Sequence, residues 1–255
     1  MKIVHISDIH CTRGMDFNPK MFQKAVEMVN AEEEVSFVFI SGDLTTEGLL
    51  DEYQLASEHL KLITHRQIIV PGNHDERNLG YKLFPEFFGD PSFIHTIDSV
   101  TLVGLASSEP DKDDGRLGRA RHQFIEQGIA LQNDLTIVGF HHHLIPVPNS
   151  GREKNIIEDA GETLDIILKH NIPLVLMGHR HVPYGVRIHN TLLINAGTFS
   201  CNRTRARFHH TFNIITIDDS CVDVTVVDCT KNTRCKMITF DNKQKWYENK
   251  FCIFS

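Results

Sequence analysis

Side chains that commonly bind metal ions follow several apolar, strand-like runs of this sequence. The run Gln67–Val70 stops at Pro71-Gly72 and is followed at once by an amide, an imidazole and a carboxylate: Asn73, His74 and Asp75. A strand that ends in this way places polar side chains at the carboxyl edge of a sheet, where α/β proteins tend to keep their chemistry. Other apolar runs end in the same manner, and the residues that follow them are Asp8 and His10, Asp43, His141, and His179 and His181.

These residues form a ligand set of oxygen atoms and imidazole nitrogens without a thiolate. Such a set suits Mn, Fe, Zn, Co or Ni better than a soft-metal site. In Asp8-x-His10 and His179-x-His181 the paired residues are two positions apart, so a locally extended backbone would aim both side chains to one side. Seven candidate ligands are too many for one ordinary centre and suit two metal ions with a bridging carboxylate. Each motif alone could be a turn or a solvated loop, but their coincidence at successive strand ends favours a metal site.

The elements expected to position these residues begin in β-α-β-α-β order. Apolar runs predict strands at 2–6, 35–40 and 67–70, with one helix starting at the Asn18-Pro19 cap and another over 51–63. Later strands are expected at 92–97, 100–105, 135–140 and 174–177, with helices over 119–131 and 155–170. The segment 185–240 is typical of a β meander. The pattern predicts one α/β domain spanning residues 1–255, with a β-rich C-terminal third.

Composition narrows the classes of function. The chain has 26 Lys and Arg against 33 Asp and Glu, a net charge of −7, which argues against broad capture of nucleic acid or of an anionic membrane. Met1 precedes a strand-like run, and no apolar run approaches the roughly 20 residues that cross a bilayer, so a cytoplasmic location is expected. The six cysteines contain no CxxC pair, and a reducing cytosol favours free thiols. The C-terminal strands could pair a homodimer, although ordinary sheet edges give the same pattern.

The whole set of motifs resembles one known superfamily, the calcineurin-like metallophosphoesterases. The matching motifs are Asp8-x-His10, Gly42-Asp43, Gly72-Asn73-His74-Asp75, His141-His142 and Gly178-His179-x-His181, and the resemblance covers residues 4–197. The stretches GDLTTEG, VPGNHDER and LGRAR look most like the branch that includes class III cyclic-nucleotide phosphodiesterases, which also hydrolyses other phosphodiesters and phosphomonoesters. The resemblance implies a four-layer α-β-β-α sandwich of two mixed β-sheets with a dinuclear metal centre at the strand ends.

Carried over residue by residue, the resemblance also implies roles. One metal would bind Asp8, His10 and His181, the other would bind Asn73, His141 and His179, and Asp43 would bridge both. His74 would face the substrate as a general acid or electrostatic stabiliser. Asp75 could orient the His74 ring or serve only the turn, and Arg77 and His142 are weaker candidates for substrate contact. The branch usually has His-His-Pro at its third block, whereas three histidines stand here, so an alignment slipped by one residue would make His142 the ligand instead of His141.

A mechanism follows from this ligand set. Two divalent or mixed-valence metal ions would lower the pKa of a bound water, and the resulting hydroxide would attack phosphorus. The leading hypothesis is hydrolysis of a small phosphodiester, with a cyclic nucleotide as one candidate. The alternatives are a phosphomonoesterase or nuclease of the same superfamily and a non-catalytic interaction module on the same fold. The acidic charge weighs against a nuclease, and the filled ligand and histidine positions weigh against a non-catalytic module.

Overall fold

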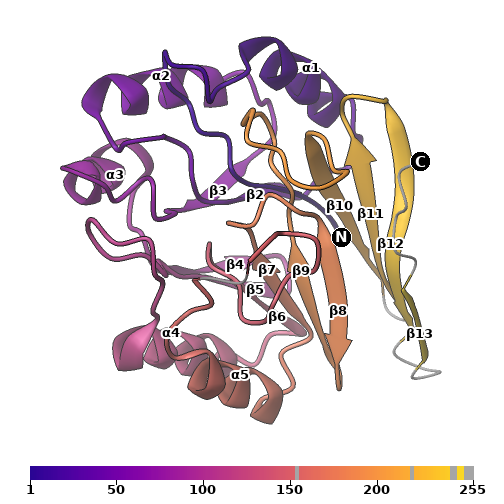
Figure 1. The fold of residues 1–255 in the computed structure, drawn as a ribbon. Coiled ribbons are helices and arrows are strands. Elements are labelled where there is room, and N and C mark those ends of the chain that lie inside the picture. Colours follow the sequence, from indigo (N-terminus) through magenta and orange to yellow (C-terminus); the bar gives the residue numbers. More distant parts are fainter. Residues whose placement is uncertain (153–154, 219–220, 242–245, 250–255) are drawn as a thin grey trace.

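Two mixed β-sheets stacked face to face form the centre of the protein, and helices cover both outer faces (Figure 1). The computed structural model describes residues 1–152, 155–218, 221–241 and 246–249. The first sheet contains β1 (Lys2–Ile6), β2 (Phe37–Ser41), β3 (Gln67–Val70), β10 (Thr211–Ile217), β11 (Cys221–Asp228), β12 (Thr233–Asp241) and β13 (Trp246–Asn249). The second contains β4 (Phe93–Ile97), β5 (Val100–Gly104), β6 (Leu135–Gly139), β7 (Leu174–Met177), β8 (Tyr184–Ile188) and β9 (Thr191–Asn195).

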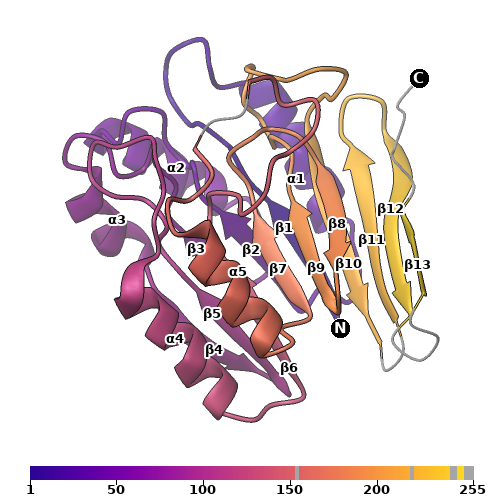
Figure 2. The ribbon, with the colours of Figure 1, turned by 60° about the horizontal axis from the view of Figure 1, so that its bottom comes forward.

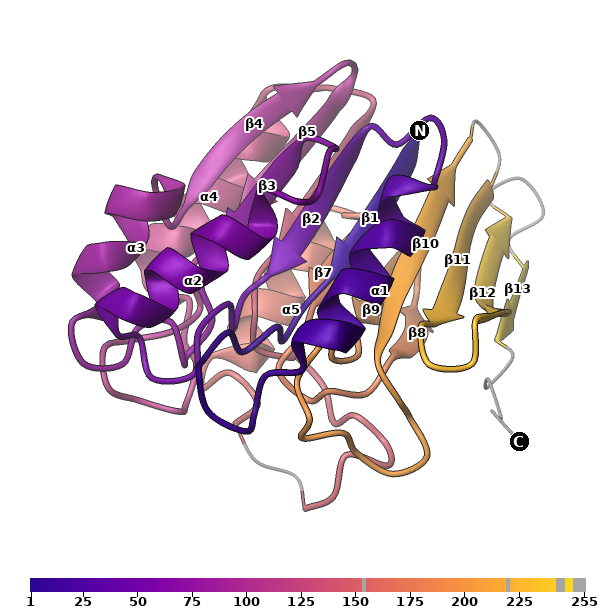
Figure 3. The same cartoon turned by 90° about the horizontal axis from the view of Figure 1, so that it is seen from above.

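The helices divide between the two outer faces. The helices α1 (Pro19–Asn30), α2 (Leu50–Leu60) and α3 (Gly80–Phe88) lie over the first sheet, as Figure 3 shows from above. The helices α4 (Gly118–Ala130) and α5 (Ala160–Lys169) lie over the second sheet and come forward in Figure 2. The strand orders are β13-β12-β11-β10-β1-β2-β3 and β4-β5-β6-β7-β9-β8. The four-layer sandwich of two mixed sheets predicted from the sequence is therefore confirmed.

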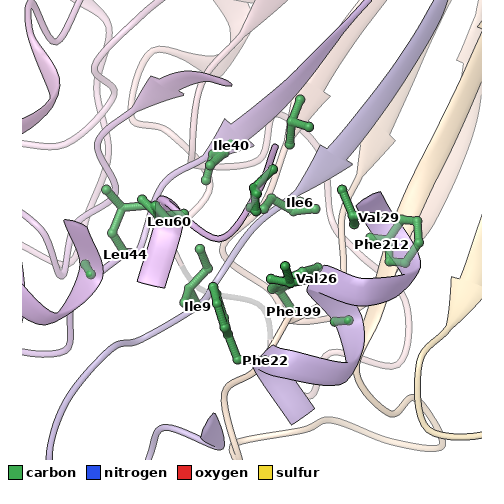
Figure 4. Close-up of a cluster of buried hydrophobic side chains, with 14 of the residues drawn as sticks. Ile6, Ile9, Phe22, Val26, Val29, Ile40, Leu44, Leu60, Phe199 and Phe212 are labelled. Atoms are coloured by element: carbon green, nitrogen blue, oxygen red, sulfur yellow. The ribbon is translucent and has the colours of Figure 1, made fainter. Parts of the chain in front are cut away.

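Among the described residues, three separate apolar clusters hold the four layers together. They are separate because side chains alternate between the two faces of each strand. On the outer face of the first sheet, Ile6 and Ile40 share a cluster with Phe22 and Val26 of α1 (Figure 4). A second cluster lies between the sheets and a third lies beneath α4 and α5. The helix α1 begins where the sequence predicted, since the Asn18 side chain accepts a hydrogen bond from the Met21 N–H at 3.0 Å.

The parallel part of each sheet sets the position of the functional loops. In the first sheet β1, β2 and β3 are parallel, and in the second β5, β6, β7 and β9 are parallel. Parallel neighbours end at the same edge of a sheet, so the loops after β1, β2 and β3 lie together, as do those after β6 and β7. Both sets of loops meet at one end of the sandwich.

Some sequence expectations differ from the structure. The helix predicted over 155–170 begins only at Ala160. The expected C-terminal meander is divided, because β8 and β9 join the second sheet whereas β10 pairs with β1 in the first. Cys235 is disulfide-bonded, contrary to the expectation of free thiols, while Cys11, Cys201, Cys221 and Cys229 are free. Among the described residues, every helix is too short or too polar to cross a membrane.

Candidate metal centre

The seven candidate metal ligands meet at the end of the sandwich where the parallel strands stop. All seven are buried except His179, which is half-buried. Those from the first sheet follow β1, β2 and β3, and those from the second follow β6 and β7: Asp8, His10, Asp43 and Asn73, and His141, His179 and His181. Each sheet alone therefore supplies only part of the site.

The ligand atoms fall into two compact groups. In one, atoms of Asp8, His10 and His181 all lie within 4.8 Å of one another, and His181 Nε2 is 3.2 Å from Asp8 Oδ1. In the other, atoms of Asp43, His141 and His179 lie within the same limit. The amide oxygen of Asn73 joins this second group, at 3.2 Å from His141 Nε2 and 3.0 Å from His179 Nδ1. The structure thus brings together the residues of each ligand set that the resemblance implied, and their binding of metal stays a prediction.

Asp43 lies between the two groups. Its Oδ2 atom is 3.4 Å from His10 Nε2 and 3.2 Å from His141 Nε2, so one carboxylate oxygen faces both. Its other oxygen accepts a hydrogen bond from the His74 backbone N–H at 3.0 Å, which fixes the orientation of the carboxylate. The geometry is that expected of a bridging ligand.

The charges of the buried groups suit a cation. Burial alone would raise the pKa of Asp43, but the neighbouring histidines, His141 first, hold it well below its usual value. Burial lowers the pKa values of His10 and His179 well below the ordinary range. Burial also lowers the pKa of His141, yet the charge and hydrogen bond of Asp43, with the charge of Asp8 and the Ser41 hydrogen bond, together outweigh burial and raise the pKa to about 9. The ionised Asp43 and the neutral His10 and His179 are in the states that metal ligands require. The raised pKa of His141 shows instead that positive charge is favoured beside Asp43.

Unpaired polar atoms also fit a metal ion. Asp8 Oδ1 and His10 Nε2 are buried and have no hydrogen-bond partner among the described residues. A buried polar atom without a partner costs free energy, and native proteins seldom leave one unexplained. Both atoms belong to the group of Asp8, His10 and His181. A cation bound there would satisfy both.

The backbone at the ligands is not extended, contrary to the sequence expectation. Five of the seven candidate ligands have left-handed backbone conformations, with φ between 54° and 71°: Asp8, His10, Asp43, His179 and His181. Residues other than glycine rarely adopt this region, and the strain that it stores is concentrated at functional sites. The residue between the two ligands of each pair, Ile9 or Arg180, is also buried. The paired ligands converge through left-handed backbone at both residues of each pair rather than through strand alternation.

Hydrogen bonds outside the two groups orient the ligands. His141 Nδ1 donates to the Ser41 carbonyl at 2.6 Å and His181 Nδ1 donates to the Arg203 carbonyl at 2.7 Å, because a carbonyl can only accept. Each ring is left with Nε2 facing the cluster. The Asn73 amide nitrogen donates to Asp113 Oδ1 at 3.2 Å, which turns the amide oxygen toward His141 and His179. These contacts select the ligating atom of each side chain.

His74 follows Asn73 in the sequence and lines a cleft beside the two groups of candidate ligands. Its Nδ1 donates to the Thr46 carbonyl at 2.6 Å, so Nε2 is left toward the cleft. A ligand atom of His74 also lies within 4.8 Å of ligand atoms of His10 and Asp43, so geometry alone would allow it to bind a metal. Its catalytic role therefore stays a prediction.

The three weaker sequence candidates have other partners. Asp75 does not orient the His74 ring: its carboxylate accepts from the Gly72 and Thr45 backbone N–H groups, at 2.9 and 2.8 Å, which matches the structural alternative. The His142 ring is buried, and its nitrogens contact Ser107 Oγ at 2.9 Å and the Asp113 carbonyl at 3.0 Å. Both His142 ring nitrogens thus have protein partners, whereas His141 lies in the group with Asp43 and His179, and the choice between them as ligand stays a prediction. Arg77 lines the cleft but pairs with Glu47 and Asp113.

Sequence reasoning missed the residues that orient the ligands. Asp113 lies in a polar loop, and only that loop's position near a site was predictable. Thr46 and Ser41 act through backbone carbonyls, which leave no signal in side-chain patterns. Arg203 contacts two candidate ligands: its carbonyl bonds His181, and its Nη2 atom is 3.1 Å from His10 Nδ1.

The chain is similar to several known phosphoesterases. The family model described as calcineurin-like phosphoesterase matches residues 1–183. A probable cyclic nucleotide phosphodiesterase from Coxiella burnetii is 27% identical over 216 residues, 77% of this chain and 82% of that protein. A probable glycerophosphodiester phosphodiesterase from Arcobacter nitrofigilis is 26% identical over 198 residues, 71% of this chain and 72% of that protein. The structure of a purple acid phosphatase from yellow lupin superposes with a TM-score of 0.70 at 16% identity. The superposition covers 95% of this chain and 54% of the phosphatase chain. At this identity the similarity shows the fold alone.

Proposed function

The chain belongs to the calcineurin-like phosphoesterase family and is a metallophosphoesterase, and we propose that it hydrolyses small phosphodiesters at a centre of two metal ions. Its relatives are named for cyclic nucleotides and for glycerophosphodiesters, so these two classes are the first substrates to test. The native metals are Mn, Fe, Zn, Co or Ni, in line with the oxygen and imidazole ligands. We further propose that residues 1–255 form one domain, since β10 to β13 extend the sheet that β1 to β3 begin.

The observation that carries this proposal is the position of Asp43 between two buried ligand groups. Asp8, His10 and His181 would hold one metal. Asn73, His141 and His179 would hold the other, and Asp43 would contact both. A carboxylate in this position lowers the repulsion between two cations at close distance, which a single-metal site does not need.

The chain's own residues have separate tasks in this reaction. Two such metal ions supply an activated water and stabilise negative charge on phosphoryl oxygens. His74 keeps its Nδ1 proton on the Thr46 carbonyl, so its Nε2 can hold a second proton and pass it to the leaving oxygen, or can stabilise charge there. Asp113 keeps the Asn73 amide turned toward the metals. The backbone N–H of His74 donates a hydrogen bond to the Asp43 carboxylate, so the position of the proton donor depends on that of the bridging ligand.

Hydrolysis of bis-p-nitrophenyl phosphate tests the proposal. The protein loaded in turn with Mn²⁺, Fe²⁺, Co²⁺, Ni²⁺ or Zn²⁺ should hydrolyse this diester and at least one cyclic nucleotide or glycerophosphodiester. Asp43→Asn should abolish the activity, whereas Asp114→Asn, at an exposed position of a nearby loop, should keep it. A wild-type protein that is inactive with every metal on diesters, monoesters and single-stranded DNA would favour a non-catalytic interaction module.

A further inference from the structure

One wall of the cleft beside the metal centre is built from arginines. The cleft has a volume of about 280 Å³, and besides Arg77 four arginines from three separate loops line it: Arg152, Arg180, Arg203 and Arg205. We call these four residues the arginine wall. They follow β6, β7 and β9 respectively, the last two residues belonging to one loop. Such a concentration of positive charge is notable in a chain whose net charge is −7.

Hydrogen bonds fasten the wall together. Arg180 is only 4% exposed, and its guanidinium donates to Ser150 Oγ at 2.9 Å and to the Arg152 carbonyl at 3.0 Å. Arg205 donates to the Ser150 carbonyl at 2.8 Å. The segment that carries Arg152 is thereby tied to the loops after β7 and β9. The Arg180 and Arg205 side chains and the Arg152 backbone are thus anchored to one another through Ser150, whereas the Arg152 side chain is exposed.

Two exposed arginines of the wall, Arg152 and Arg205, have no carboxylate partner among the described residues. Within the same part of the chain, Arg203 approaches only Asp16, at 3.5 Å. Arg77, which also lines the cleft, differs because two carboxylates neutralise it. Positive charge without a partner beside a binding cleft attracts anions.

Arg203 connects the wall to the metal centre. Its Nη2 donates to His10 Nδ1 at 3.1 Å. If His10 binds a metal through Nε2, its Nδ1 carries the ring proton and can no longer accept this bond. The Arg203 guanidinium then loses this acceptor, and an anion bound in the cleft that Arg203 lines can replace it.

We propose that the arginine wall binds a second phosphate group of the substrate, so that preferred substrates are phosphodiesters carrying an additional phosphate. This inference rests on the proposed function. The phosphodiester that is cleaved has a single negative charge, which the metals and His74 offset. Guanidinium groups bind phosphate with paired, charge-assisted hydrogen bonds, which makes arginine the suitable residue for a phosphate remote from the metals. A cyclic nucleotide with one phosphate would leave the wall unoccupied.

Two matched substrates test the proposal: the p-nitrophenyl ester of thymidine 5′-phosphate, and the same ester with a 3′-phosphate. At constant ionic strength, the wild-type kcat/KM should be about tenfold or more higher for the 3′-phosphorylated ester, as expected for charge-assisted contacts. Arg152→Gln should reduce this ratio, and Arg152→Gln with Arg205→Gln should bring it close to one. Arg207→Gln, an exposed arginine outside the cleft lining, should leave it unchanged.

The single variant Arg152→Gln should fold normally, because the Arg152 side chain makes no hydrogen bond with the described residues. A change in its substrate ratio therefore reports on binding and not on folding. A wild-type ratio near one, or a ratio that both variants retain, would overturn the proposal.

A binding measurement separates this proposal from the proposed function. Calorimetry on the metal-loaded protein would compare thymidine 3′,5′-bisphosphate with thymidine 5′-monophosphate. If neither ester were hydrolysed, the proposed function would fail, but the wall would still predict tighter binding of the bisphosphate, by about tenfold. That advantage should be lost in the double variant. Equal affinities of the wild type for the two nucleotides would contradict the wall irrespective of activity.

Discussion

Replacing Asp75 by alanine should destabilise the fold strongly, although Asp75 belongs to neither ligand group. The carboxylate is fully buried. Its Oδ2 accepts from the Gly72 N–H at 2.9 Å, and its Oδ1 accepts from the Thr45 N–H at 2.8 Å and from Thr45 Oγ1 at 3.0 Å. The carboxylate therefore fastens the loop after β2 to the loop after β3.

The size of the effect follows from these contacts. Each buried donor left without an acceptor costs about 1–3 kcal/mol, so three donors would cost about 3–9 kcal/mol. An opposing effect reduces this sum, since burial and the charge of Asp43 raise the pKa of Asp75 to about 7. The wild-type protein thus already bears a cost for the ionised carboxylate. We expect Asp75→Ala to lower the free energy of unfolding by about 3 kcal/mol, near the lower end of the range.

Urea unfolding monitored by circular dichroism, with a chelator present, measures this loss. Asp113→Ala is the matched control, because its carboxylate is 62% exposed and its ion pair with Arg77 lies at the surface. An exposed pair of this kind contributes about 1 kcal/mol or less. If Asp75→Ala lost no more stability than Asp113→Ala, the structural role assigned to Asp75 would be refuted.

Two further predictions concern neighbouring residues. Burial raises the pKa of Glu76 to about 7 from 4.5, so between these values the native state binds a proton that the unfolded state has lost, and stability falls as pH rises. Glu76→Gln removes this pH dependence. In urea unfolding, the free energy of unfolding of the variant should therefore rise relative to that of the wild type by up to about 3 kcal/mol between about pH 4 and pH 8. A difference between the two proteins that does not change with pH would contradict this prediction. A Cβ atom at Gly72 would collide with the Asp43 carboxylate, so Gly72→Ala should lower the metal content measured by mass spectrometry. Gly161→Ala, where a Cβ meets no atom within 4 Å, is its control, and equal metal content in the two variants would count against the position given to Asp43.

The sequence predicts well where the candidate ligands lie, because their positions follow from the strands. Each apolar run could be located from its hydrophobic pattern, and the polar residue after it lies at the carboxyl edge whatever the details of the loop. Asp43 and His141 illustrate this, since each follows a buried strand of a different sheet by only a few residues. The two sheets bring them together at 3.2 Å.

The contacts that orient the ligands could not be predicted in this way. Asp113 reaches Asn73 from 40 positions along the chain, and His141 donates to a carbonyl 100 positions away. The arginine wall likewise depends on loop conformations that no periodic pattern encodes. Arg203 and Arg205 line the cleft, whereas Arg207, with the same spacing in the sequence, does not. Left-handed turns at His179 and His181 replaced the extended backbone that their spacing indicated.

Metal content measured together with turnover, for Asn73→Ala and His74→Ala, tests most directly the division between ligands and the proton donor. Asn73→Ala should lose about one of the two metal ions, because it removes a ligand from one group only. His74→Ala should retain both metals and lose about 10²–10⁴-fold in kcat on bis-p-nitrophenyl phosphate, the usual contribution of a general acid. Loss of a metal from His74→Ala would instead place His74 among the ligands with His10 and Asp43, and would contradict the account.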